Sequence, residues 1–147
     1  MRRSSGDNDK WGAGMDRTNA EAKSSADLVR AFLGSWNCRD LDHLVSYFSE
    51  DAVYHNVPVA PIKGIAGIRK IFAQFLDVFA QASLDVVSIA SSTDLVLVER
   101  VDRFVMHDGR RIELPVTGVF ELAGGKIVRF SDYFDLGDFQ RQSGLSL

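Results

Sequence analysis

The spacing of apolar residues changes once along this chain, close to Gln81, and this change limits the possible fold more than any other feature. Before Gln81, apolar residues recur every three or four positions, as on one face of an amphipathic helix. After it they alternate with a period of two, which is typical of strands with one buried face. Helices followed by a run of strands predict an α+β fold.

Three helices are predicted in the first part of the chain. The first begins at Thr18 and ends near Gly34, and a short second one follows Asp40, a residue type that caps helix N-termini. The third, over 64–79, has a broad apolar stripe that we interpret as core packing.

Five strands are predicted, one before the third helix and four after it. The turn sequences Asp108-Gly109 and Gly124-Gly125 separate later strands and are typical of β-hairpins. The strands are expected over 52–57, 84–90, 95–106, 111–122 and 126–134. Successive hairpins predict a mostly antiparallel sheet with the helices packed on one face.

Composition excludes several classes of protein. The 147 residues fit one domain, and a net charge of −3 lacks the broad basic field that nucleic-acid binding needs. Cys38 is the only cysteine, so an internal disulfide and a thiolate zinc site are excluded. No apolar run is long enough to span a membrane. We therefore expect a cytoplasmic protein with a mobile N-terminal arm over 1–17 and one domain over 18–147.

Charged residues interrupt apolar faces at two places in the predicted sheet. Arg100 and Asp102 share a strand face with four apolar residues, and Asp132 lies in the middle of another apolar stripe. Tyr54 and Asn56 lie two positions apart on one face of the earlier strand.

Buried charges must satisfy one another, and one arginine between two aspartates does so. With both carboxylates ionised the trio has a net charge of −1, which favours the binding of one proton. Asp102 and Asp132 would then supply one acid and one base near neutral pH. Tyr54 and Asn56 are able to hold a water molecule between them. An ion-pair network that only stabilises the sheet fits the pattern equally well.

The segments around these residues resemble the limonene-1,2-epoxide hydrolase family. They are Tyr54-His55-Asn56-Val57-Pro58, Glu99-Arg100-Val101-Asp102, Gly118-Val119-Phe120 and Asp132-Tyr133-Phe134-Asp135. The resemblance extends from about Asp27 to Phe139. It implies the nuclear transport factor 2-like (SnoaL-like) cone fold, a curved, mostly antiparallel sheet packed by three helices around an internal pocket.

The resemblance also implies a reaction, the one-step addition of water to a small apolar epoxide, without cofactor or metal. Asp132 would be the base that activates a water held by Tyr54 and Asn56, and Asp102 the acid that protonates the epoxide oxygen. Arg100 would bridge the two carboxylates. The loop 57–62 and the helix 64–79 would line the pocket.

Two alternatives stay open at this point. The first is a ketosteroid-isomerase-like or polyketide-cyclase-like enzyme, although the isomerases would have an aspartate in place of Asn56. The second is a non-enzymatic cone protein that binds a small ligand, since fold does not determine function. A homodimer is also expected, because the outward positions of the long strands are apolar. These positions are Leu95, Leu97, Val101, Val105 and Val119.

Overall fold

The computed structural model describes residues 8–147, and its second half consists of strands joined by hairpins, as the period of two predicts. Strands β3 (Phe79–Ser91), β4 (Leu95–Met106), β5 (Arg111–Ala123) and β6 (Lys126–Tyr133) pair antiparallel in chain order. Gly109, Gly124 and Gly125 have φ angles of 89°, 58° and 73°, which explains why the two later turns require glycine.

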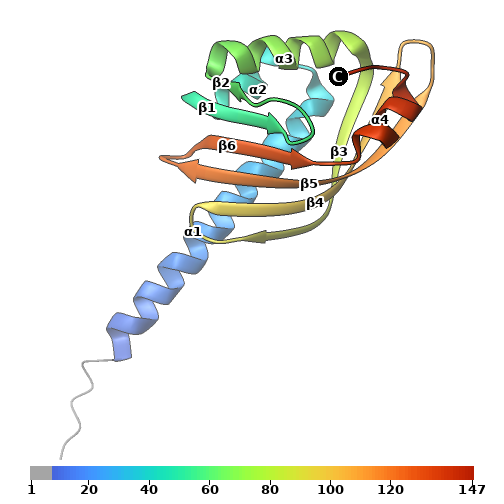
Figure 1. The fold of residues 1–147 in the computed structure, drawn as a ribbon. Coiled ribbons are helices and arrows are strands. Elements are labelled where there is room, and N and C mark those ends of the chain that lie inside the picture. The colour runs from blue at the N-terminus through green and yellow to red at the C-terminus, as the bar shows by residue number, and fades with distance from the viewer. Residues whose placement is uncertain (1–7) are drawn as a thin grey trace, which may run out of the picture.

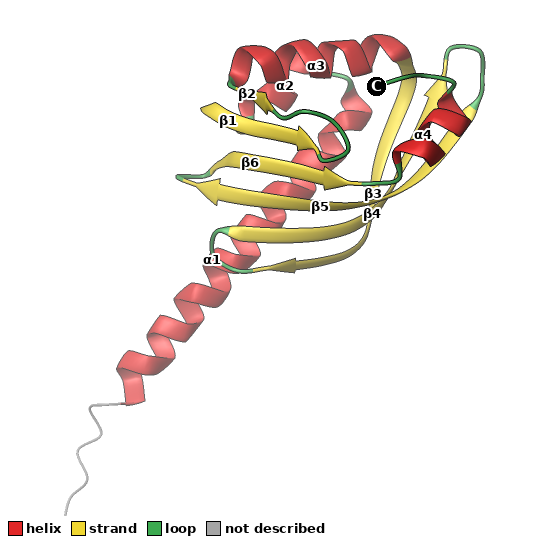
Figure 2. Ribbon diagram, viewed as in Figure 1, coloured by secondary structure: helices red, strands yellow, loops and turns green. Residues whose placement is uncertain are grey.

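The sheet has six strands and is mixed. Its order is β2-β1-β6-β5-β4-β3, where β1 is Phe48–Asn56 and β2 is Ile62–Lys63. Strand β1 lies parallel to β6, so that Asn56 is the register partner of Asp132 (Figure 2). This parallel pair brings the residues of the early strand beside those of the late one.

Helices pack against the curved sheet to form the core. They are α1 (Asn8–Ser35), α2 (Leu41–Ser46), α3 (Ile65–Val78) and α4 (Leu136–Ser143), with a 3-10 turn, η1, at Trp36–Cys38. Phe32 of α1 is fully buried, and its ring lies 6.2 Å from that of Phe72 on α3 and 6.1 Å from that of Phe120 on β5. These contacts hold the two long helices on the inner face of the sheet and confirm the α+β class.

The first helix begins earlier than the predicted start at Thr18. Helix α1 begins at Asn8, so residues 8–17, which we assigned to a mobile arm, form the first turns of one continuous helix. Figure 1 shows this part of α1 projecting away from the sheet. Extending an existing helix adds one hydrogen bond per residue, whereas starting a new one is costly. Residues 1–7 of the predicted arm lie outside the described residues.

The fourth helix, α4, was not predicted. The Asp135 side chain caps its N-terminus by accepting a hydrogen bond of 2.9 Å from the backbone N–H of Asp138, and Gly144 ends it with a left-handed φ of 73°. Phe139 is its one buried apolar residue, so the helix lacks the repeated apolar spacing that predicted the others. None of the helices in the described part of the chain is long and apolar enough to cross a membrane.

Candidate active site

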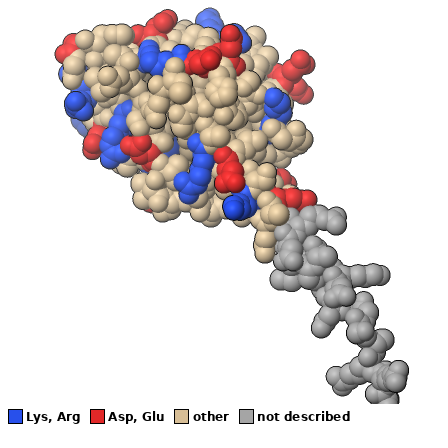
Figure 3. Space-filling model, turned by 180° about the vertical axis from the view of Figure 1, so that it is seen from behind, with Lys and Arg blue, Asp and Glu red and all other residues tan. Residues whose placement is uncertain are grey.

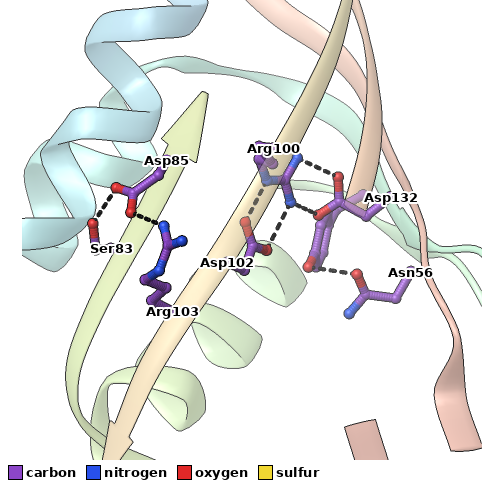
Figure 4. Close-up of polar contacts among 8 residues, drawn as sticks. Asn56, Ser83, Asp85, Arg100, Asp102, Arg103 and Asp132 are labelled. Atoms are coloured by element: carbon purple, nitrogen blue, oxygen red, sulfur yellow. Dashed lines mark hydrogen bonds and ion pairs between the residues drawn. The ribbon is translucent and has the colours of Figure 1, made fainter. Parts of the chain in front are cut away.

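Arg100 lies between Asp102 and Asp132 and donates hydrogen bonds to both (Figure 4). Its Nε and Nη2 atoms lie 2.6 and 3.1 Å from the two carboxylate oxygens of Asp102. Its Nη1 and Nη2 atoms lie 2.8 and 2.5 Å from those of Asp132. The exposed fractions are 1% for Arg100, 6% for Asp102 and 5% for Asp132. The structure therefore pairs these three charged residues as the sequence predicted.

Gly118 gives Arg100 its path between the strands. Arg100 and Asp102 belong to β4 and Asp132 to β6, so the arginine side chain must pass over β5 to reach Asp132. Gly118 on β5 is the register partner of Asp132, and a Cβ atom built on it would lie 2.5 Å from Nη1 of Arg100. The bridge therefore depends on the absence of a side chain at this position.

Burial raises the pKa of both carboxyl groups. For Asp102, loss of hydration is the largest cause; the charge and hydrogen bonds of Arg100 oppose it, and the charge of Asp132 adds to it, bringing the pKa to about 6. Burial likewise raises the pKa of Asp132, again against the opposing effect of Arg100. Burial alone would lower the pKa of Arg100, but the two carboxylates outweigh it and the net shift is upward. The trio is thus a charged arginine beside two carboxyls that hold protons more tightly than usual.

Tyr54 and Asn56 adjoin the trio on β1. The Tyr54 hydroxyl donates a hydrogen bond of 2.8 Å to Oδ1 of Asn56, and burial raises the pKa of Tyr54 well above its usual range. The hydroxyl therefore stays protonated. This leaves the Nδ2 donor of Asn56 and an oxygen lone pair of Tyr54 available for a water molecule next to Asp132.

These five polar residues line one cavity, which holds about 680 Å³ of unfilled space including its open mouth. Helix α3 contributes Phe75 and Leu76 to the lining, as expected for 64–79. The loop 57–62 leads from β1 to β2 at the edge of the sheet and, contrary to our expectation, contributes no residue to the cavity.

Three lining residues could not be found from the sequence: Trp36, Phe139 and Leu147. Trp36 is in the short η1 turn, Phe139 is in the unpredicted α4, and Leu147 follows α4. For Phe139 the sequence did contain one signal: Asp135 followed by Asp138 is a spacing typical of a helix N-terminus and would have indicated the start of α4.

A second polar network shares no hydrogen bond with the site, although the charge of Asp85 adds slightly to the raised pKa of Asp102. Asp85 on β3 accepts hydrogen bonds from Ser83 and Arg103, and Arg103 also contacts Glu113 at 3.1 Å. In Figure 4 this network lies apart from Arg100 and its two carboxylates. Its members are largely exposed, so it contributes little to stability.

Basic and acidic side chains are interspersed on the face of the molecule shown in Figure 3, and neither charge forms a large patch there.

Comparisons with known proteins relate this chain to epoxide hydrolases by sequence. Residues 23–144 match the family model of the limonene-1,2-epoxide hydrolase catalytic domain. The chain is 29% identical over 110 residues to the epoxide hydrolase EphG of Mycobacterium tuberculosis, covering 75% of this chain and 72% of that protein.

Solved structures show the same fold. A limonene-1,2-epoxide-hydrolase-like epoxide hydrolase from M. tuberculosis superposes with a TM-score of 0.74 and 27% identity, covering 84% of this chain and 91% of that one. A proposed polyketide cyclase from Xanthomonas campestris pv. campestris gives a TM-score of 0.77 at 20% identity, covering 84% and 98%. The predicted nuclear transport factor 2-like cone fold is thus confirmed, with a sheet that is curled but not closed.

Proposed function

Because the chain belongs to the limonene-1,2-epoxide hydrolase family, we propose that it adds water to a small apolar epoxide in one step and releases a vicinal diol. Asp132 is the base, Asp102 is the acid, and Arg100 holds both. Tyr54 and Asn56 position the attacking water.

The proposed step balances within these residues. The Nδ2 group of Asn56 donates to the water oxygen, and the water donates to Asp132 and to the Tyr54 hydroxyl oxygen. As the water oxygen attacks an epoxide carbon, Asp132 takes its proton and the C–O bond breaks. Asp102 gives its proton to the departing oxygen, which becomes the second hydroxyl. One proton must then return to Asp102, and one must leave Asp132, before the next turnover.

One observation carries this proposal, the buried bridge of Asp102, Arg100 and Asp132 at the wall of an apolar cavity. A carboxyl with a pKa of about 6 retains enough of its proton near neutral pH to act as an acid. The pKa of Asp132 is raised as well, which fits a pair of carboxyl groups that holds one proton between them near neutral pH. The likeness to a proposed polyketide cyclase, at 20% identity, concerns the fold alone.

The test is diol formation by the full chain from limonene, cyclohexene and styrene epoxides, without added cofactor or metal. An Asp132→Asn preparation purified in parallel controls for contaminating hydrolases. In heavy-oxygen water, a single turnover should place the label in the diol. Label found first in an aspartate side chain would mean a covalent ester intermediate and would contradict direct attack by water. Absence of diol from the whole panel would contradict the proposed reaction.

We further propose that the protein is a cytoplasmic homodimer. A chain whose only cysteine is the free Cys38 makes no use of an oxidising compartment. Apolar side chains on the outer face of the sheet supply a surface for a second copy, with Leu97 on β4 44% exposed and Tyr133 on β6 50% exposed.

A further inference from the structure

Five phenylalanines at one end of the cavity form a continuous set of ring contacts. We call this set the aromatic end; it consists of Phe75, Phe79, Phe104, Phe134 and Phe139. Phe79 stacks on Phe104 with ring centroids 4.3 Å apart and an interplanar angle of 17°. Phe139 meets both Phe79 and Phe134 edge to face, at 6.4 and 6.3 Å. Phe75 lies 6.5 Å from Phe79.

The aromatic end adjoins the acid and the base. Phe104 follows Asp102 by two residues on β4, and Phe134 follows Asp132 by two residues, immediately after β6 ends. Two residues of extended chain advance about 6.8 Å. A ring attached one or two bonds from an epoxide that is held between the aspartates therefore reaches these phenylalanines.

Aliphatic residues supply most of the remaining apolar wall of the cavity, namely Leu76, Leu84, Leu114, Val116 and Leu147. Aliphatic side chains bury any apolar group, whereas aromatic rings also distinguish between ligands. Ring faces are electron-rich and ring edges electron-poor, so a ligand ring that stacks or meets them edge to face gains about twofold to tenfold in affinity for each favourable pair.

We infer that the substrates of this site are epoxides with an aromatic ring attached close to the oxirane, and that this ring packs within the aromatic end. That the bound molecules are epoxides rests on the proposed function, whereas the preference for an aromatic over a saturated ring does not depend on it. A saturated ring has the larger apolar surface, so a cavity without aromatic selectivity would favour it.

The test compares two epoxides that differ only in the ring, benzyloxirane and (cyclohexylmethyl)oxirane. In both, a methylene separates the ring from the oxirane, so their intrinsic reactivities are similar. The full chain should hydrolyse benzyloxirane with a kcat/KM roughly three- to tenfold higher. A parallel calorimetric titration with phenylacetamide and cyclohexylacetamide measures the same preference as a ratio of Kd values, without any reaction.

Matched variants locate the source of the preference. Phe104→Leu removes one ring from the aromatic end, and Phe134→Leu is a second variant in case the first fails to fold. Leu114→Val, beside Asp102 on the neighbouring strand, shortens a lining side chain without removing a ring. Either phenylalanine variant should lower the aryl-to-cyclohexyl ratio at least threefold, whereas Leu114→Val should keep it within twofold.

The outcomes separate this inference from the proposed reaction. A wild-type ratio of one or less in both assays overturns the aryl preference, even if both epoxides are hydrolysed. A ratio above one that survives both phenylalanine variants overturns the role of the aromatic end. Tighter binding of phenylacetamide, with no diol from either epoxide, supports the aryl preference and contradicts the hydrolase.

Discussion

Gly118 and Arg100 approach so closely that a Cβ atom on the glycine would lie 2.5 Å from Nη1 of the arginine. The same Cβ would lie 3.0 Å from Oδ1 of Asp132, the oxygen that accepts a hydrogen bond from Nη1. Strand β5, which lies between Asp102 and Asp132, therefore leaves room for the guanidinium only because it has no side chain at this position. The arginine and its two partners are buried, so the guanidinium has little space into which it could move aside.

Gly118→Ala should consequently impair the reaction more than it impairs folding. The guanidinium must move away from Asp132, and a displacement of about 1 Å in an active site can cost about 10²-fold in turnover. With its partner displaced, the pKa of Asp132 should rise, and the acidic limb of the kcat/KM profile should shift to higher pH. Kinetics measured from pH 5 to 9 give both quantities.

Gly34→Ala is the matched control for this substitution. Gly34 lies on α1, and a Cβ there meets no atom within 4 Å. Alanine in an open helical position should leave turnover unchanged and stabilise the fold by roughly 0.5–1 kcal/mol. If Gly118→Ala behaved like Gly34→Ala in the pH profile, the positioning role of Gly118 would be wrong.

Replacing either carboxyl by an amide should nearly abolish diol formation. Asp132→Asn and Asp102→Asn keep the side-chain shape but cannot transfer the proton, and the loss of one acid or base role costs about 10²–10⁴-fold. Each variant still pairs Arg100 with one carboxylate, so circular dichroism and thermal melting should show a folded protein. A folded Asp132→Asn variant with near wild-type turnover would contradict its assignment as the base.

The sequence predicted β4, β5 and β6 closely and placed Arg100, Asp102 and Asp132 in the interior, for a physical reason. Turn glycines such as Gly109 mark where one strand ends and the next begins. The alternation of side chains along each strand then determines which of them face inward. The even-numbered positions of β4 were therefore predicted to face inward, and Arg100 and Asp102 are indeed buried. Local pattern was sufficient because each of these elements pairs with its neighbour in the chain.

Features that depend on distant parts of the chain were not predictable in this way. The parallel pairing of β1 with β6 joins segments that most of the domain separates, and no local pattern identifies that partner. The passage of Arg100 over Gly118 depends on the register of three strands. Phe139 enters the cavity only because α4 packs back on the sheet, although its helix has little apolar periodicity.

Removing residues 1–15 should leave both folding and activity nearly unchanged. Helix α1 bonds to the sheet further along, where Ser91 donates to the carbonyl oxygen of Ala22 at 2.8 Å and Ser25 donates to that of Thr93 at 2.5 Å. These contacts survive the truncation. Melting temperature and kcat/KM of the shortened chain provide the measurement. A large loss of turnover with the fold intact would mean that the removed segment contributes to the cavity.

Light scattering at micromolar concentration should give the mass of a dimer. Leu97→Glu places a charge among the exposed apolar residues of the outer sheet face and should shift the mass to that of a monomer. Lys70→Glu, on an exposed part of α3, is the control and should leave the dimer intact. A wild-type mass equal to one chain would contradict the proposed assembly.

The raised pKa of Asp102 should make stability fall as pH rises. This carboxyl titrates at about 6 in the folded protein, because of burial, and near ~3.9 in the unfolded chain. The folded state therefore holds the proton more tightly, and the resulting stabilisation is complete below about pH 4 and is lost as pH rises through 6. At about 1.4 kcal/mol for each pKa unit, the loss by pH 8 is on the order of 3 kcal/mol. An asparagine at this position does not titrate, so Asp102→Asn should not lose this stability. The free energy of unfolding of the variant minus that of the wild type should therefore increase by about the same amount from pH 4 to pH 8. Urea unfolding of both proteins at the two pH values measures the difference. If variant and wild type differed in unfolding free energy by the same amount at pH 4 and pH 8, Asp102 would titrate as an ordinary carboxyl and would not be the proton donor proposed here.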